Sequence, residues 1–373
     1  MPRAVPSPRL VRGIFFLGLL SSLPASAATP YRPADDSIVL ERLPAAPLPV
    51  VRAAPPALTA EQAAAIAQLQ INRARSSGDP RFLGYAQGAL APWWRSEDAP
   101  DAVLLIRATL RQSFHDFDGA LGDLDRLLAR RPDDAQAWLT RATVLRVLGR
   151  YPEAGAACMR LQGLVDPFAS QLCTAAVRGL SGELAAAIRM LDGLRPGLKT
   201  QPPSIVAWYF AERAEMSSRA GDSAKAEALY REALAEVPED LNLRVACADL
   251  LLDRDGAQDV LELIDADSAV DELRLRRALA LRALNDPAFG ALDAQIRNGF
   301  DAARRRGEAL HRREEALYVL RTTSEARRAL QLAQDNWAVQ HEPWDARLLI
   351  EAAQAAGRPD AAAPVRTWIA STG

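Results

Sequence analysis

Residues 135–154, AQAWLTRATVLRVLGRYPEA, contain a pattern that returns along the chain at a fixed interval. The element Trp138-x-x-Arg141-Ala142 follows Leu104-x-x-Arg107-Ala108 by 34 residues and precedes Phe210-x-x-Arg213-Ala214 by 72. A second alanine stands twelve residues after the first in every copy, and in two copies a proline stands a further twelve residues on: Ala120, Ala154, Ala226, Pro132 and Pro238. A 34-residue period is typical of stacked helix–turn–helix units.

Each recurring residue suits a pair of antiparallel helices. Small side chains such as Ala142 and Ala154 allow the two helices to approach closely at their crossing. Gly149 is expected to end the first helix, because glycine tolerates the left-handed backbone of a C-terminal cap. Pro152 suits the first turn of the next helix, while Pro132 and Pro238 are expected to follow the ends of second helices.

The chain resembles a tetratricopeptide repeat (TPR) protein, most clearly over residues 101–168 and 207–240 and more loosely from about 59 to the end. It carries Arg-Ala where that family usually has Leu-Gly, which keeps the small residue at the crossing. The resemblance implies an all-α fold, a right-handed superhelical solenoid of stacked helix–turn–helix repeats. Aligning the first helices predicts about nine helix pairs, starting near residues 64, 101, 135, 168, 207, 241, 271, 308 and 343.

Residues 59–373 are therefore expected to form one repeat domain, in which each unit packs only on its neighbours. The segment 196–203, PGLKTQPP, adds roughly five residues to the period and is a candidate hinge. The last two predicted helices, near 343–356 and 359–370, should shield the end of the stack from water.

Residues 1–27 have the features of an export signal. A basic start with Arg3, Arg9 and Arg12 precedes the short apolar stretch GIFFLGLLSSL at 13–23. Ala25-Ser26-Ala27 is a small-x-small site, and cleavage after Ala27 would leave a periplasmic or secreted chain that begins at Ala28. The alternative is an uncleaved membrane anchor. No other apolar run approaches about 18 residues, so the mature chain is not expected to span a membrane.

Residues 28–58 differ in composition, with seven prolines between Pro30 and Pro56. Such a segment favours an extended, polyproline-like tether over a packed core. It is either a plain spacer or a strand that docks in the protein's own groove or on a partner.

The sequence offers no recognisable catalytic or cofactor motif. His115, His311 and His341 share no spacing, and no paired Cys-x-x-Cys, glycine-rich phosphate loop or Gly-x-Ser-x-Gly elbow occurs. We therefore expect no enzyme activity, no cofactor and no metal site. The net charge of −2 gives no reason to expect nucleic-acid binding.

Two of the three cysteines are candidates for a disulfide. Cys158 is predicted on the second helix of one unit and Cys173 on the first helix of the next, and such helices stack. An exported chain permits the bond. The alternative is two small buried hydrophobic side chains, which is also the simplest interpretation of Cys247.

The leading functional hypothesis is a non-enzymatic scaffold of the periplasm or cell envelope that binds a partner protein or peptide. The resemblance implies that the first helices line a concave groove. Residues predicted to face it are Arg146, Trp208, Glu212, Glu215, Arg219, Asn242 and Asp249, with Trp208 as an exposed aromatic anchor. Carboxylates are prominent in this set, which favours a basic ligand whose binding weakens with salt. The alternative is a structural assembly factor, or a subunit of an envelope or export machine, associated with polysaccharide or peptidoglycan enzymes.

Overall fold

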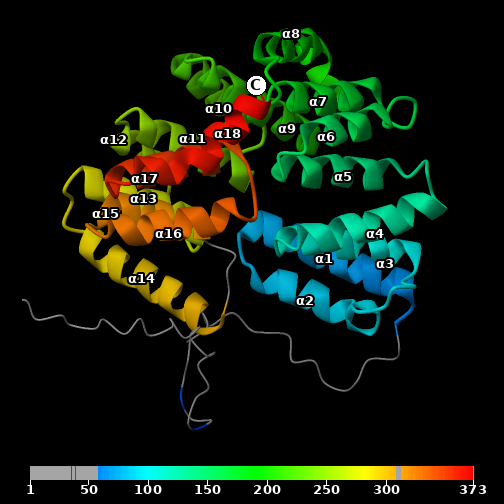
Figure 1. Cartoon of the computed structure of the whole chain (residues 1–373), viewed down its shortest axis with the longest axis horizontal. Coiled ribbons are helices and arrows are strands. Elements are labelled where there is room, and N and C mark those ends of the chain that lie inside the picture. Colours follow the sequence, from blue (N-terminus) through cyan, green and yellow to red (C-terminus); the bar gives the residue numbers. More distant parts are fainter. Residues whose placement is uncertain (1–34, 36–37, 39–57, 308–311, 373) are drawn as a thin grey trace, which may run out of the picture. The chain divides into compact units, whose positions relative to one another are not determined.

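The computed structural model of the chain describes residues 35, 38, 58–307 and 312–372 (Figure 1). It divides into two units, Met1–Val39 and Leu40–Gly373, and all the helices described belong to the second. The predicted export signal and nearly all of the predicted tether lie outside the described residues.

The described part of the chain consists of helices and connecting turns, without a strand. Figure 1 shows the helices following one another along the ribbon from α1 to α18, and consecutive helices form nine pairs. The prediction of an all-α solenoid of about nine helix pairs is confirmed. The α-helices are α1 Ala60–Ser77, α2 Arg81–Ala89, α3 Asp101–Ser113, α4 Phe117–Arg130, α5 Ala135–Val147, α6 Tyr151–Met159, α7 Pro167–Arg178, α8 Leu184–Leu194, α9 Pro203–Arg219, α10 Ser223–Glu236, α11 Leu241–Asp253, α12 Ala257–Leu263, α13 Asp271–Ala283, α14 Phe289–Arg305, α15 Arg312–Thr322, α16 Ala326–Trp337, α17 Pro343–Ala355 and α18 Ala363–Thr372. Three short 3₁₀ helices join them: η1 Ala91–Trp93, η2 Arg195–Thr200 and η3 Pro359–Ala362.

The ends of the helices follow from local sequence. Gly149, just beyond α5, has φ 71°, the left-handed backbone that glycine adopts without a steric penalty. Pro152 lies in the first turn of α6, as predicted. At five helix starts an aspartate side chain accepts a hydrogen bond from a backbone N–H of the first turn, an N-cap that stabilises a helix by about 1 kcal/mol. These caps are Asp116, Asp134, Asp166, Asp222 and Asp240.

The small residues of the repeat lie at the helix crossings. Ala142 on α5 and Ala154 on α6 are both buried, as are their counterparts in the other two clear repeats. The arginine that precedes the alanine is also buried in two repeats. Arg107 is 1% exposed and donates to both carboxylate oxygens of Asp123 on α4, at 2.7 and 2.6 Å. Arg213 binds Asp192 at 2.7 Å. In these two repeats the arginine of the pattern therefore joins helices and is not available to a ligand.

The candidate hinge at 196–203 is ordered as η2 and the start of α9. Leu198 is buried in the core formed by the middle repeats, and Gly197 lies against the ring of Phe168. Motion at this segment stays a prediction.

The cysteines of neighbouring repeats are joined. Cys158 on α6 and Cys173 on α7 form a disulfide with their Cα atoms 5.6 Å apart. Cys247 on α11 is buried and carries a free thiol, and burial raises its pKa to about 11.

The final repeat also contacts the third repeat, which is distant in sequence. The backbone N–H of His341 donates to the carbonyl of Val147 in the third repeat at 2.7 Å. Trp368 on α18 lies against Gly149 and faces the ring of Tyr151, with ring centroids 6.0 Å apart. The ninth repeat thus closes against the third, a contact that a nearest-neighbour view of repeats does not anticipate.

Candidate binding site on the concave face

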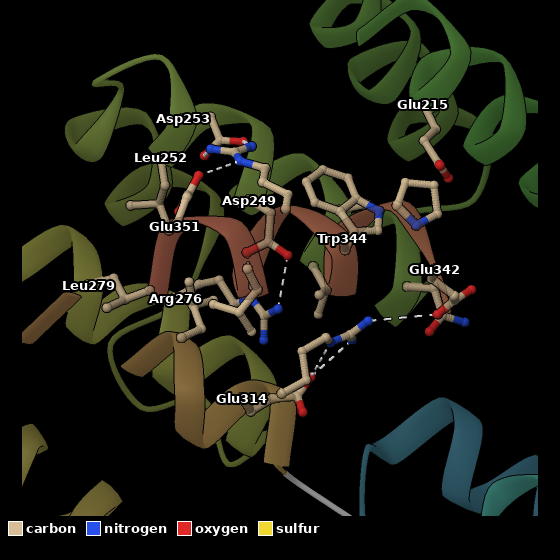
Figure 2. A pocket seen from close by; sticks show the side chains of 18 of the residues that line it. Glu215, Asp249, Leu252, Asp253, Arg276, Leu279, Glu314, Glu342, Trp344 and Glu351 are labelled. Atoms are coloured by element: carbon tan, nitrogen blue, oxygen red, sulfur yellow. Dashed lines mark hydrogen bonds and ion pairs between the residues drawn. The ribbon is translucent and has the colours of Figure 1, made fainter. Parts of the chain in front are cut away.

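A cavity of about 740 Å³ lies among the first helices of the repeats (Figure 2). Its walls come mainly from α5, α9, α11, α13, α15 and α17, together with Tyr151 at the start of α6. The first helices face it because their alanines are turned toward their partner helices, which leaves the opposite side for polar residues. Closure of the ninth repeat on the third brings α17 to the far wall.

Five of the seven predicted groove residues line this cavity: Arg146, Glu212, Glu215, Asn242 and Asp249. Trp208 and Arg219 are not among its lining residues. Trp208 is half-buried between two cores, and its indole N–H donates to Glu212 Oε1 at 3.1 Å. Arg219 donates to the carbonyl of Gly179 at 2.7 Å.

One expectation about these residues was wrong. Trp208 is not an exposed anchor, because it packs between neighbouring repeats. Glu212 is only 6% exposed and forms an ion pair with Arg146 on α5. Its replacement by alanine would leave a partly buried guanidinium without its counter-charge, so Glu212 is a structural residue as well as a lining one.

Sequence reasoning did not include α17 in the site. Trp344, Glu342 and Arg347 line the cavity from the ninth repeat, and Figure 2 shows Trp344 and Glu342 on the side of the cavity where Glu215 lies. The half-buried Trp344, and not Trp208, is therefore the tryptophan of this face. Only the fold brings it there, because it belongs to a repeat distant in sequence.

Charges on the cavity wall are nearly balanced, which corrects the expectation that carboxylates dominate. Six arginines and seven carboxylates line it. Most pair with one another: Arg276 with Asp249 at 2.9 Å, Arg313 with Glu314 at 3.0 Å, Arg321 with Glu351 at 2.5 Å and Arg347 with Asp253 at 2.7 Å. Such paired groups contribute little net field to a ligand.

Two carboxylates are less well compensated. The nearest cation to Glu215 is Arg219 at 3.6 Å, and that of Glu342 is Arg313 at 3.9 Å. Burial, followed by the negative charge of Glu212, raises the pKa of Glu215 to about 7. Burial and the neighbouring Asp345 raise the pKa of Glu342.

Glu314 behaves in the opposite way. Burial disfavours its charged form, but the guanidinium groups of Arg313 and Arg276 outweigh that effect and lower its pKa to about 2. The carboxylate of Glu314 is therefore well compensated by neighbouring arginines, whereas those of Glu215 and Glu342 are not.

Within residues 58–307 and 312–372, no group of His, Cys, Asp and Glu side chains is arranged to hold a metal ion. In the same part of the chain no helix has the length and apolar character that a membrane span requires. His115 stacks on Phe117 and His341 packs against Trp337, whereas His311 lies outside the described residues.

No protein-family model and no curated protein matches the chain. Among solved structures it is similar to a thermophilic TPR protein of Thermus thermophilus, at 21% identity and a TM-score of 0.42, covering 52% of this chain and 100% of that one. It is also similar to a tetratricopeptide repeat protein from Parabacteroides merdae, at 13% identity and a TM-score of 0.41, over 77% of this chain and 99% of the other. A third is the APC/C hetero-tetramer Cut9–Hcn1, at 12% identity and a TM-score of 0.42, over 82% and 68%. At these values neither a ligand nor a partner of this chain follows from the likeness.

Proposed function

We propose that the protein is a non-enzymatic scaffold that binds a peptide or protein partner in the cavity on its concave face. The observation that carries this proposal is the cavity itself, which six first helices and Trp344 line. A concave site with aromatic residues and several polar groups is typical of peptide recognition. Its charged side chains are mostly held in ion pairs and are therefore already oriented before a partner arrives.

The proposal includes export to the periplasm or the exterior. The basic start, the short apolar stretch at 13–23 and the Ala25-Ser26-Ala27 site support it. The disulfide between Cys158 and Cys173 supports it as well, because such bonds persist in oxidising compartments. N-terminal sequencing of protein from the envelope fraction should begin at Ala28, and a mature chain that begins at Met1 would contradict export with cleavage.

Site-directed photo-crosslinking tests the binding face. Asn242 and Glu236 are both exposed, but only Asn242 lines the cavity, whereas Glu236 lies at the end of the second helix α10. With a photo-reactive amino acid at each position in turn, a defined partner should crosslink from position 242 and not from 236. Crosslinks from position 236 alone would move the interface to the convex face.

A further inference from the structure

One end of the cavity holds an uneven set of charges. Glu212 and Glu215 lie there on α9, and Glu342, the residue before α17, also lines this end. Figure 2 shows Glu215 and Glu342 on the same side of the cavity, which is also the side of Trp344. The cations within electrostatic reach of Glu215 are Arg146 and Arg219. Glu342 has Arg313 at 3.9 Å, but that guanidinium also pairs with Glu314 at 3.0 Å, so four carboxylates share three guanidinium groups.

Glu215 is the carboxylate of this set that the protein satisfies least. Glu212 accepts hydrogen bonds from Arg146 and from Trp208, and Glu342 takes part in the N-terminal cap of α17. Glu215 has the contact to Arg219 at 3.6 Å, which is an ion pair outside hydrogen-bond distance. Its side chain is 27% exposed at the cavity wall, so an incoming group can reach it.

Tyr151 provides a second, independent observation. This residue is 2% exposed, yet it lines the cavity, and its hydroxyl has no hydrogen-bond partner among the described residues. A buried hydroxyl without a partner costs about 1–3 kcal/mol, so its presence at a cavity wall points to a polar group that completes it. Burial raises the pKa of Tyr151, the charges of Glu342 and Glu215 act in the same direction, and Arg146 and Arg219 oppose them. The hydroxyl therefore lies close to the same carboxylates and guanidinium groups as Glu215.

We propose that Glu215, Glu342 and Tyr151 form a subsite for a guanidinium or ammonium group, which in the proposed function is an arginine or lysine side chain of the partner. A cation there balances the carboxylate that has no guanidinium group of its own. Trp344 lines the same cavity. The assignment rests on the proposed function only for the source of the cation, because the same subsite accepts a free amine of similar size.

Binding at this subsite should release protons near neutral pH. Glu215 has a pKa of about 7 because burial and Glu212 oppose its ionisation. A bound cation favours the carboxylate and lowers that pKa, so protonated Glu215 loses its proton on binding. The charged and titratable groups that face Glu215 are Glu212 and Arg219 of α9, Arg146 of α5, Tyr230 of α10, Glu342 before α17 and Tyr151 of α6.

The experiment uses two capped pentapeptides, Gly-Ser-Arg-Ser-Gly and the same peptide with citrulline, the neutral isostere of arginine. Titration calorimetry with the full mature chain should give at least tenfold tighter binding of the arginine peptide at pH 7.5. In buffers of different ionisation enthalpy, the arginine peptide should release a fraction of a proton, and the citrulline peptide none. Agmatine, titrated separately, distinguishes a free amine from a peptide side chain as the source.

Two variants locate the effect. Glu215→Gln should remove the preference for arginine and the proton release, whereas Glu232→Gln, an exposed carboxylate on α10 outside the cavity, should keep both. Circular dichroism and thermal melting verify that both variants are folded. Three results would each overturn the subsite. The first is equal affinity for the two peptides, and the second is a preference for arginine that persists in Glu215→Gln. The third is that neither peptide nor agmatine binds. Crosslinking at position 242 tests the proposed function separately. A crosslinked partner would support the scaffold even if the peptide experiment contradicts the cation subsite.

Discussion

Glu212 and Glu215 lie three residues apart on α9 and differ in how the protein compensates their charges. Glu212 forms an ion pair with Arg146, whose side chain is about one quarter exposed. Glu212→Ala should therefore lower the free energy of unfolding by about 2 kcal/mol, less than for a fully buried pair. Denaturant unfolding at pH 7 measures this change. Glu232→Ala, which breaks an exposed pair with Arg195, should cost under about 1 kcal/mol, and equal effects of the two would show that the Arg146 pair is not special.

Glu215 should make stability depend on pH in the opposite sense to most carboxylates. Its folded-state pKa of about 7 lies above the ordinary value of 4.5, so the folded chain keeps a proton that the unfolded chain has lost between these pH values. The contribution of this carboxyl to stability is full below pH 4.5 and is lost as the pH rises through about 7.

The neutral variant Glu215→Gln should thus match the parent protein near pH 5 and exceed its stability near pH 8. We expect a gain of about 1 kcal/mol, reduced from the full linkage value because the side chain is partly exposed and coupled to Glu212. Denaturant unfolding at the two pH values, with Glu232→Gln as control, measures it. A variant less stable than the parent at pH 8 would contradict the raised pKa.

At the scale of elements, the helix crossing in the third repeat is a sensitive position. Ala142 is buried where α5 meets α6, so Ala142→Leu should destabilise the protein by about 1–3 kcal/mol through overpacking. Ala156 lies on the exposed side of α6, and Ala156→Leu should change stability by under about 0.5 kcal/mol. Similar melting temperatures for both variants would mean that the crossing tolerates a larger side chain.

The disulfide ties α6 to α7 and closes a loop of 15 residues. By chain entropy such a bond should stabilise the protein by about 3 kcal/mol. Thermal melting with and without dithiothreitol tests this: the reductant should lower the melting temperature of the parent and leave a Cys158→Ala/Cys173→Ala variant unchanged. A parent protein indifferent to the reductant would contradict the bond or its contribution.

Element boundaries could be predicted from the sequence because their causes are local. Gly149 follows the end of α5 and Pro152 lies in the first turn of α6, and both positions follow from the backbone preferences of these two residue types. Side-chain roles on those elements could not be predicted in the same way. Glu212 looked like an exposed groove residue, but its partner Arg146 lies 66 residues away in sequence, and only the curvature of the stack brings the two together.

At the scale of the whole repeat domain, closure of the ninth repeat on the third can be tested at a glycine. A Cβ at Gly149 would lie 2.6 Å from Trp368 Nε1, in addition to the strain of φ 71°. Gly221 has a similar φ of 83° with no neighbour within 4 Å. Gly149→Ala should therefore lower the melting temperature more than Gly221→Ala, and the difference reports the closure contact. Equal losses would show that strain alone accounts for both.

The candidate site depends on this closure, which explains why the sequence revealed only part of it. The repeat pattern predicted residues of α5, α9 and α11, because it predicts which face each first helix turns inward. It could not predict Trp344, Glu342 or Tyr151, which meet at one end of the cavity only after the ninth repeat reaches the third. The 34-residue period predicts how adjacent repeats pack, whereas the contact between the ninth and third repeats joins units that are not adjacent.

The contact between the ninth and third repeats also limits how such a chain can change in evolution. An open array gains or loses a unit freely, because every other interface is preserved. Here one additional 34-residue unit between α7 and α17 would carry Trp368 away from Gly149 and His341 away from Val147. Relatives that keep the closed arrangement should therefore hold the number of units between these two repeats constant.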